Sequence, residues 1–223
     1  MYKKFAAIGA AVFALALPLA GAQVSAAPGG IEIEPAPPGK ITIEVVTVNG
    51  TGCPKDTAAV AVSPDNTAFT VTYSQYTAGV GPGTGPMDFR KNCQLNLKVN
   101  VPQGFTYGIA SADYRGFASL AKGATALERA RYYFQGNSPT DFVDHTFAGP
   151  FSDDWQKTDT TDVHSIVYAP CGARLNFNIN TQLRVDAGKS DPKKETSFIT
   201  MDSTDGSINT TYHFAWKVCP TNP

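Results

Sequence analysis

Hydrophobic and polar side chains alternate with a period of two along much of this chain, most clearly between Ala173 and Asp186. One side of that segment carries Leu175, Phe177, Ile179, Thr181, Leu183 and Val185, and the other carries Arg174, Asn176, Asn178, Asn180, Gln182 and Arg184. Successive side chains of a β-strand point to opposite faces of a sheet, so the pattern predicts a strand with one buried face. Sheets with one face on the core and one in water are typically antiparallel.

Three further segments repeat this alternation, at residues 94–101, 69–74 and 212–218. Residues 123–135 are ambiguous, because the first half favours a helix by propensity whereas the second half alternates, and we predict a strand there. Turn sequences separate the runs, for example at 63–66, 102–104 and 205–206. Short strands with frequent turns predict an all-β fold, namely an antiparallel β-sandwich.

The N-terminus has the features of an export signal. Lys3 and Lys4 precede an apolar run over residues 5–20, and small residues follow it. Cleavage after Ala22 or after Ala26 fits this pattern, and we favour Ala26. The predicted organisation is a cleaved signal peptide at 1–26, an extended Pro/Gly-rich leader at 27–40 and a single β-sandwich domain at 41–223. No later segment is apolar for long enough to span a bilayer, so we expect a secreted protein with no transmembrane segment after cleavage.

The four cysteines, Cys53, Cys93, Cys171 and Cys219, all follow the predicted signal peptide. An even number of cysteines in an exported chain indicates two disulfides. Three pairings are possible, and we predict Cys53 with Cys93 and Cys171 with Cys219. The main alternative joins Cys53 to Cys219, near the two ends of the folded region. A zinc site is disfavoured because the CxxC or CxxH spacing is missing.

Short motifs in a fixed order make the chain similar to a known family. They are Gly52-Cys53-Pro54, Asn92–Leu97, Pro102–Phe105, Asp113–Gly116, Tyr133–Gly136, Phe147–Pro150, Pro170–Gly172 and Leu175–Val185, followed by Trp216 and Cys219. In this order the chain resembles a family of secreted bacterial and fungal proteins known as domain-of-unknown-function family 4360, from about residue 50 to residue 219. The resemblance implies export and a compact domain, and it brings no activity and no functional residue with it.

Amide side chains supply the candidate ligand-binding face. Asn176, Asn178, Asn180 and Gln182 project from one side of the strand predicted at 173–186, and Asn96 and Asn100 project from one side of the strand predicted at 94–101. If these strands are neighbours, their amides form a flat array of donors and acceptors that matches sugar hydroxyls, and a nearby aromatic ring could stack on a pyranose. The other interpretation is a solvated outer sheet face without a ligand.

An acidic segment offers an alternative, catalytic interpretation. Its titratable residues are Asp141, Asp144, His145, Asp153, Asp154, Asp159, Asp162 and His164. A glycosidase needs two facing carboxyls, and a hydrolytic triad needs a nucleophile, a histidine and a carboxylate in register. Neither a GxSxG nor an HExxH motif is present, and the same residues suit a polar surface region. We therefore assign no catalytic residue.

Asp202 and Asp205 offer hard oxygen ligands beside Gly206, which suits calcium. The segment lacks the spacing and the terminal glutamate of an EF-hand loop, and Asp-Gly is more typical of a hairpin tip. We expect no cofactor, with calcium at this loop as the alternative.

The charge balance bears on possible partners. The formal net charge is −1, so the chain has no excess of positive charge to attract nucleic acid. The leading hypothesis is a secreted, non-enzymatic binding or structural protein of the extracellular space or cell envelope, with polysaccharide or cell wall as its candidate partner. The alternative is a secreted, glycan-directed hydrolase that uses residues 141–164.

Overall fold

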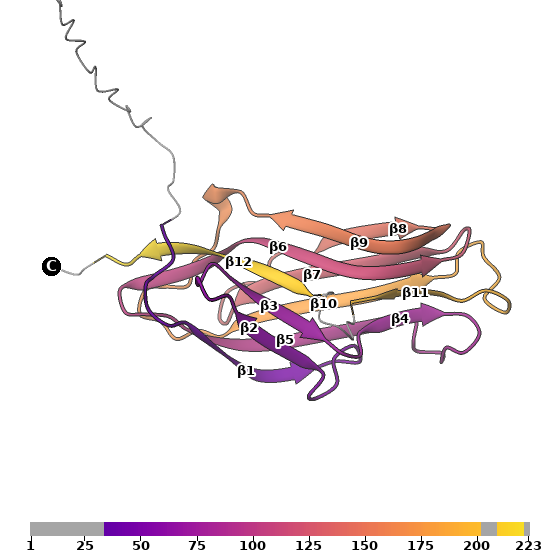
Figure 1. Cartoon of the computed structure of the whole chain (residues 1–223), viewed down its shortest axis with the longest axis horizontal. Coiled ribbons are helices and arrows are strands. Elements are labelled where there is room, and N and C mark those ends of the chain that lie inside the picture. The colour runs from indigo at the N-terminus through magenta and orange to yellow at the C-terminus, as the bar shows by residue number, and fades with distance from the viewer. Residues whose placement is uncertain (1–33, 202–208, 221–223) are drawn as a thin grey trace, which may run out of the picture. The chain divides into compact units, whose positions relative to one another are not determined.

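The computed structural model describes residues 34–201 and 209–220 of the chain. The signal peptide predicted at 1–26, residues 27–33 of the leader, and the candidate calcium ligands Asp202 and Asp205 lie outside the described residues. The described residues form two antiparallel β-sheets packed together, with one helical turn at Val163–Ser165 (Figure 1). The predicted all-β sandwich is confirmed.

The two sheets differ in size. The five-stranded sheet has the order β1 (Thr42–Asn49), β5 (Arg90–Asn100), β10 (Phe177–Asp186), β7 (Thr125–Phe134) and β8 (Val143–Ala148). The seven-stranded sheet has the order β2 (Ala58–Val62), β3 (Ala68–Tyr73), β12 (Thr210–Val218), β6 (Phe105–Leu120), β11 (Ser197–Thr200) and β4 (Thr77–Val80), and β9 (Phe151–Thr160) also pairs with β6. The chain passes from one sheet to the other between β8 and β9, so these strands lie at neighbouring edges of the two layers.

The alternating segments of the sequence form strands at the predicted places. Residues 94–101, 69–74 and 212–218 fall in or next to β5, β3 and β12, and β10 occupies most of 173–186. The ambiguous segment 123–135 contains strand β7, so that prediction is also confirmed. Its backbone pairs with β10 on one side and β8 on the other, and this pairing overrides the helix propensity of its first half.

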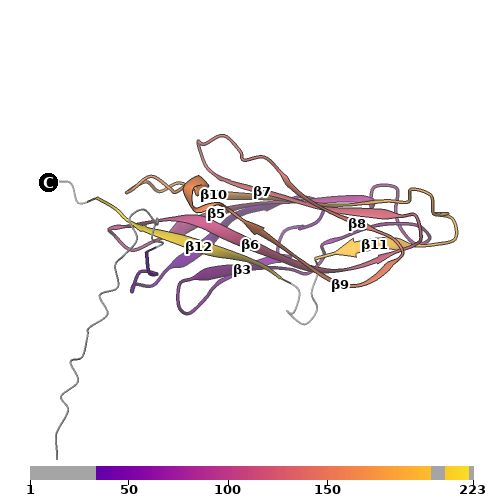
Figure 2. The ribbon, with the colours of Figure 1, turned by 90° about the horizontal axis from the view of Figure 1, so that it is seen from above.

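Aromatic side chains fill much of the space between the layers. In Figure 2, β5, β7 and β10 lie above β3, β6 and β12. Rings meet across the interface: Phe69 of β3 packs against Phe177 of β10 with centroids 6.5 Å apart, and Tyr107 of β6 packs against Phe134 of β7 at 5.2 Å. Edge-to-face contacts of this kind add to the stabilisation from burial alone.

Both predicted disulfides are present. Cys53–Cys93 joins the segment after β1 to β5, with Cα atoms 5.3 Å apart. Cys171–Cys219 joins the segment before β10 to the end of β12, with Cα atoms 5.7 Å apart. The described chain has no free cysteine between residues 34 and 220.

The described end of the leader is attached to the domain. Glu34 forms an isolated antiparallel bridge with Trp216, and the Asn66 amide donates to the carbonyl oxygens of Pro37 and Gly39 at 3.1 and 2.7 Å. Of the residues that the structure covers, none belongs to a helix with the length and hydropathy of a membrane span.

Candidate functional site

The amide side chains predicted as a binding face come from neighbouring strands. β5 and β10 are hydrogen-bonded to each other, and Asn96 lies opposite Asn178 in the antiparallel register. Two residues along, Gln94 lies opposite Asn180. Because side chains two residues apart share a face, these amides form adjacent rows on the outside of the five-stranded sheet.

β7 continues these rows on the far side of β10. It places Tyr133 opposite Asn178, Arg131 opposite Asn180, and Arg129 opposite Gln182. We call the outward side chains of the three strands the amide face, which comprises Asn92, Gln94, Asn96, Asn178, Asn180, Gln182, Arg129, Arg131 and Tyr133.

One end of the amide face satisfies its own hydrogen-bonding groups. Asn96 Nδ2 donates to Asn178 Oδ1 at 2.8 Å, and Asn176 Nδ2 donates to Asn96 Oδ1 at 2.7 Å. Asn178 is only 8% exposed. Asn100 lies outside this chain of amides and donates instead to Thr42 Oγ1 on β1 at 3.1 Å. The structure therefore divides the six predicted ligand-binding residues into two groups.

The second group, Asn180 and Gln182, retains free hydrogen-bonding capacity, and so does Gln94, which sequence reasoning did not include among the ligand-binding candidates. Neither Asn180 nor Gln94 makes a side-chain hydrogen bond to another residue within 34–201 or 209–220. Gln182 accepts from Arg90 Nε at 2.7 Å through Oε1, which leaves its NH₂ group available. These residues line an open depression of about 410 Å³, whose wall consists of Thr51, Met87, Phe89, Arg90, Lys91, Asn92, Cys93, Gln94, Phe142, Asn180, Thr181 and Gln182.

Of the two phenylalanines that line this depression, Phe89 and Phe142, the exposed one is Phe142. Its side chain is 41% exposed, and its ring centroid lies 4.2 Å from Arg131 Cζ and 5.0 Å from Arg129 Cζ. Cation–π contacts with the two guanidinium groups hold the ring at the edge of the amide face. Sequence reasoning missed Phe142, because it lies in a segment that we read for its acidic residues and no periodic pattern includes it.

A second polar cluster joins the edges of the two sheets. His145 of β8 has its Nδ1 atom 2.7 Å from Glu128 Oε2 of β7, and its Nε2 atom 2.9 Å from Asp159 Oδ1 of β9. The Glu128 side chain is fully buried. Sequence reasoning missed Glu128, although it shares the inward face of β7 with Ala130 and Phe134, and an acidic residue at such a position is a detectable signal.

Burial changes the proton affinity of this cluster. It raises the pKa of Glu128 to about 7, although the hydrogen bond with His145 acts in the opposite direction. The hydrogen bond with Glu128 in turn raises the pKa of His145, and loss of hydration raises the pKa of Asp159. Both ring nitrogens of His145 are occupied by carboxyl groups, so neither faces a substrate as a general base would.

The remaining residues of the acidic segment do not join this cluster. Asp144 pairs with Arg129, and the hydrogen bond between them lowers the pKa of Asp144. Asp162 accepts from the backbone N–H of His164 at the start of the helical turn. Asp153 and Asp154 are exposed on β9, which the sequence did not mark as a strand.

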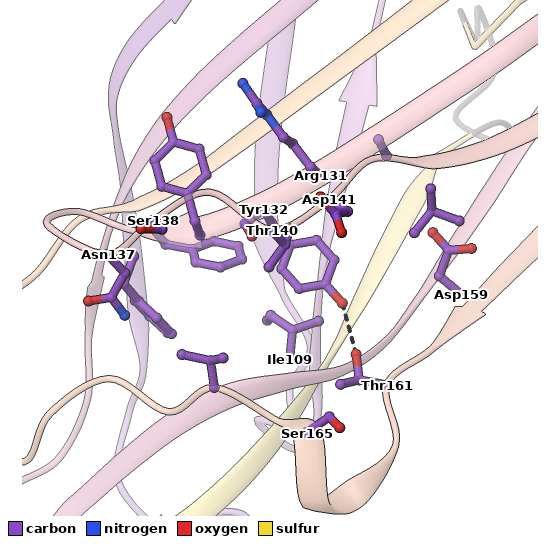
Figure 3. A pocket seen from close by; sticks show the side chains of 16 residues that line it. Ile109, Arg131, Tyr132, Asn137, Ser138, Thr140, Asp141, Asp159, Thr161 and Ser165 are labelled. Atoms are coloured by element: carbon purple, nitrogen blue, oxygen red, sulfur yellow. Dashed lines mark hydrogen bonds between the residues drawn. The ribbon is translucent and has the colours of Figure 1, made fainter.

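A partly open cavity of about 200 Å³ lies next to the cluster, lined by residues of both layers (Figure 3). Its lining is formed by Ile109, Ala130, Arg131, Tyr132, Tyr133, Phe134, Asn137, Ser138, Thr140, Asp141, Val143, Asp159, Thr161, Ser165, Val167 and Phe177. Figure 3 shows the Tyr132 side chain reaching to Thr161, with their hydroxyl oxygens 3.0 Å apart. We call this space the Tyr132 cavity.

The described part of the chain contains no group of three or more histidine, cysteine or acidic side chains arranged to hold a metal ion. Calcium binding at Asp202 and Asp205 stays a prediction, because both residues lie outside the described ranges.

Comparison with known proteins identifies relatives of this chain. An "Uncharacterized secreted protein" of Arthroderma benhamiae is 38% identical over 182 residues, which cover 82% of this chain and 73% of that protein. Among solved structures, the enzymatically active domain of tailspike protein 4 from bacteriophage CBA120 is 12% identical with a TM-score of 0.26; the match covers 78% of this chain and only 19% of the tailspike chain. A structural similarity this distant supports no inference about this protein.

The sequence profile of the family described as "Domain of unknown function (DUF4360)" matches residues 39–219. That range contains nearly the whole described domain, including all four cysteines. The predicted secretion agrees with the description of the fungal relative, and the protein is secreted. The chain belongs to the secreted family DUF4360.

Proposed function

We propose that this secreted protein is a non-enzymatic binding protein that takes extracellular polysaccharide on its amide face. The observation that carries the proposal is the pairing of β5 with β10, which brings the side-chain amides of Gln94 and Asn180 together on one face, where neither bonds a side chain of the described residues. A side-chain amide offers both donors and an acceptor, as the hydroxyl groups of a sugar require.

The aromatic wall adds a second element of sugar recognition. Phe142 is exposed and fixed by two arginines at the rim of the depression, so it can offer a ring face at little cost in conformational entropy. Arg90 and the free NH₂ of Gln182 add donors along the same depression. An open depression that combines amide groups with an exposed aromatic ring suits an extended polymer better than a small molecule that must be enclosed.

The proposal is tested by binding of the secreted chain to insoluble cell-wall polysaccharides and to a glycan array. Asn180→Ala combined with Gln94→Ala should weaken binding roughly tenfold or more, and so should Phe142→Ala. Asn100→Ala is the matched control, because Asn100 is an asparagine of the same sheet outside the depression. If the parent protein retains no polysaccharide, or if the control weakens binding as much as the paired variant, the proposal is wrong.

The alternative, a glycan-directed hydrolase, is tested on the same material by release of reducing ends. Its candidate carboxyls at the Tyr132 cavity are Asp141 and Asp159, because Glu128 is fully buried and both nitrogens of His145 are occupied. Sugar release that is lost in Asp159→Asn, in a variant whose melting temperature stays close to that of the parent, would favour the hydrolase over the binding protein.

A further inference from the structure

The Tyr132 cavity has an aromatic floor. The ring centroids of Phe134 and Phe177 are 5.3 Å apart, and those of Tyr132 and Phe177 are 5.8 Å apart. The face of an aromatic ring carries partial negative charge from its quadrupole, and it attracts cations as well as apolar groups. The floor therefore suits a ligand that is both apolar and positively charged.

The charges around the cavity have the complementary sign. Asp141 and Asp159 both border it. Asp159 is paired with His145, whereas Asp141 forms no ion pair with any other residue that the structure describes. Arg131 also borders the cavity, but its guanidinium stacks on Phe142 on the outer face of the sheet, and Figure 3 shows it turned away from the Tyr132 ring. Within the described residues, the uncompensated charge at the cavity is thus the carboxylate of Asp141.

We propose that the Tyr132 cavity binds a small organic ammonium ion, with its charged group against the aromatic rings and balanced by Asp141. The volume of about 200 Å³ equals the space of roughly six or seven waters at ~30 Å³ each, which suits a cation the size of choline. The hydroxyl groups of Ser138, Thr140 and Ser165 on the lining can bond a polar substituent of the ligand. No residue lines both this cavity and the depression beside Gln94 and Asn180, so the two proposals can fail independently.

The test is a calorimetric or NMR titration of the secreted chain with choline and with its uncharged carbon analogue, 3,3-dimethylbutan-1-ol. The two probes have nearly the same shape, so a difference between them measures the contribution of the charge. We expect choline to bind at least about tenfold more tightly than the alcohol. Absence of choline binding at about 10 mM, or equal binding of the two probes, would overturn the proposal.

Variants locate the site. Asp141→Asn should weaken choline binding about tenfold, whereas Asp153→Asn, at an exposed aspartate of β9 away from the lining, should leave it unchanged. Tyr132→Phe keeps the ring and should keep binding, whereas Tyr132→Leu should lose it. Because Asp141 is exposed and Tyr132→Phe removes only a hydroxyl, both proteins should fold. Choline binding that is insensitive to Asp141→Asn would place the ligand elsewhere and contradict the proposal.

Discussion

His145 and Asp159 connect the two sheets at the edge where β8 of one layer meets β9 of the other. The His145 Nε2 atom lies 2.9 Å from Asp159 Oδ1, while Nδ1 of the same ring lies 2.7 Å from Glu128 Oε2. The imidazole thus joins a carboxyl of its own sheet to a carboxyl of the opposite sheet. Both contacts need a proton between nitrogen and oxygen, so the cluster must hold two protons to keep both hydrogen bonds.

The proton requirement predicts that stability falls as the pH rises. Folding raises the pKa values of Glu128, His145 and Asp159. Each group therefore adds fully to the free energy of unfolding below its pKa in the unfolded chain. That stabilisation is lost as the pH rises through its pKa in the folded protein. For Glu128 the window runs from 4.5 to about 7. The free energy of unfolding should decline across it by up to about 3 kcal/mol, and further as His145 deprotonates.

Chemical denaturation between pH 5 and 8 measures this effect. Glu128→Gln removes the titrating carboxyl and keeps the size of the side chain, so the decline should be much shallower in this variant. Asp144→Asn is the matched control, because Asp144 lies next to His145 in sequence but pairs with Arg129 outside the cluster. A parent protein and a Glu128→Gln variant with the same pH dependence would show that the cluster does not govern it.

Reduction of the disulfides should destabilise the domain strongly. The bridges close segments with sequence separations of 40 and 48 residues. In the chain-entropy description each bridge contributes about 4 kcal/mol by restricting the unfolded chain. Thermal unfolding with and without reductant should show a large fall in melting temperature, and thiol titration of the unfolded, unreduced protein should detect no free cysteine. Detection of four thiols would contradict the bridged state.

Much of the fold could be predicted from sequence because it follows from a local pattern. β10 is buried on one face along its whole length, so the alternation of its residues shows both the strand and the direction of its side chains. β9 was missed for the opposite reason. It is an edge strand in which Trp155 is the one buried residue, and exposed Asp153 and Lys157 stand on the same side as that tryptophan. With charged residues on both faces, the period of two disappears.

The candidate sites depend on contacts that local patterns do not contain. The amides of β5 and β10 could be predicted to share a face only if the strands were neighbours, and this pairing joins Asn96 to Asn178, far apart in the chain. The position of Phe142 depends on its contacts with Arg129 and Arg131 of β7. The Glu128–His145–Asp159 cluster depends on how the edges of two sheets meet, which no sequence spacing encodes.

Gly116 should tolerate no side chain. A Cβ atom at this position of β6 would lie 2.1 Å from the carbonyl oxygen of Thr200 and 2.4 Å from the ring of Trp155. Because the first contact is with backbone, a strand must move, and Gly116→Ala should cost about 1–3 kcal/mol or more in a denaturant titration. Gly85→Ala is the control, since its nearest neighbour is the flexible side chain of Asp88 at 3.2 Å. Equal stability of the two variants would contradict the close approach.

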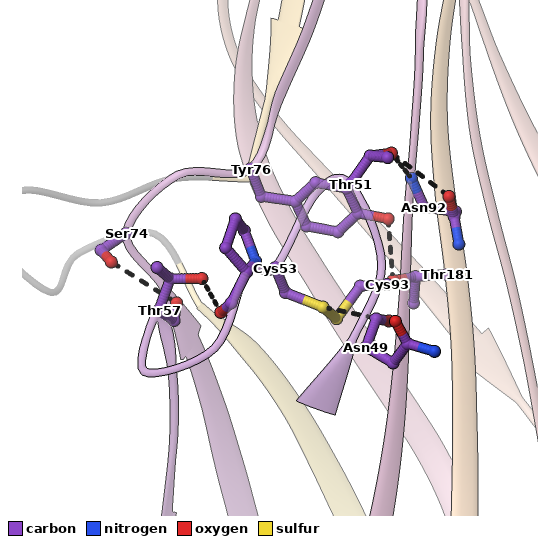
Figure 4. Close-up of a disulfide and its surroundings, with 10 residues drawn as sticks. Asn49, Thr51, Cys53, Thr57, Ser74, Tyr76, Asn92, Cys93 and Thr181 are labelled. Carbon is purple, nitrogen blue, oxygen red and sulfur yellow. Dashed lines mark hydrogen bonds between the residues drawn. A yellow bond between two sulfur atoms is a disulfide. The ribbon is translucent and has the colours of Figure 1, made fainter. Parts of the chain in front are cut away.

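Tyr76 and Thr181 form a buried hydrogen bond between the layers. The hydroxyl oxygens are 3.0 Å apart, and Figure 4 shows them beside the Cys53–Cys93 bridge, with Tyr76 between β3 and β4 and Thr181 on β10. Tyr76→Phe leaves the Thr181 hydroxyl buried without this partner, and Thr181→Val does the same to Tyr76. Each single variant should lose about 1–3 kcal/mol of unfolding free energy.

The double variant Tyr76→Phe/Thr181→Val distinguishes the hydrogen bond from packing. When both polar groups are replaced by apolar groups of similar shape, no buried hydroxyl of the pair remains to be desolvated, so the double variant should be less destabilised than the sum of the single variants. The difference, measured by denaturant titration of all four proteins, gives the coupling energy of the pair. If the destabilisation of the double variant equals the sum of the two single effects, the two hydroxyls do not stabilise each other. In that case packing of the Tyr76 ring and the Thr181 methyl group holds the layers together at this point.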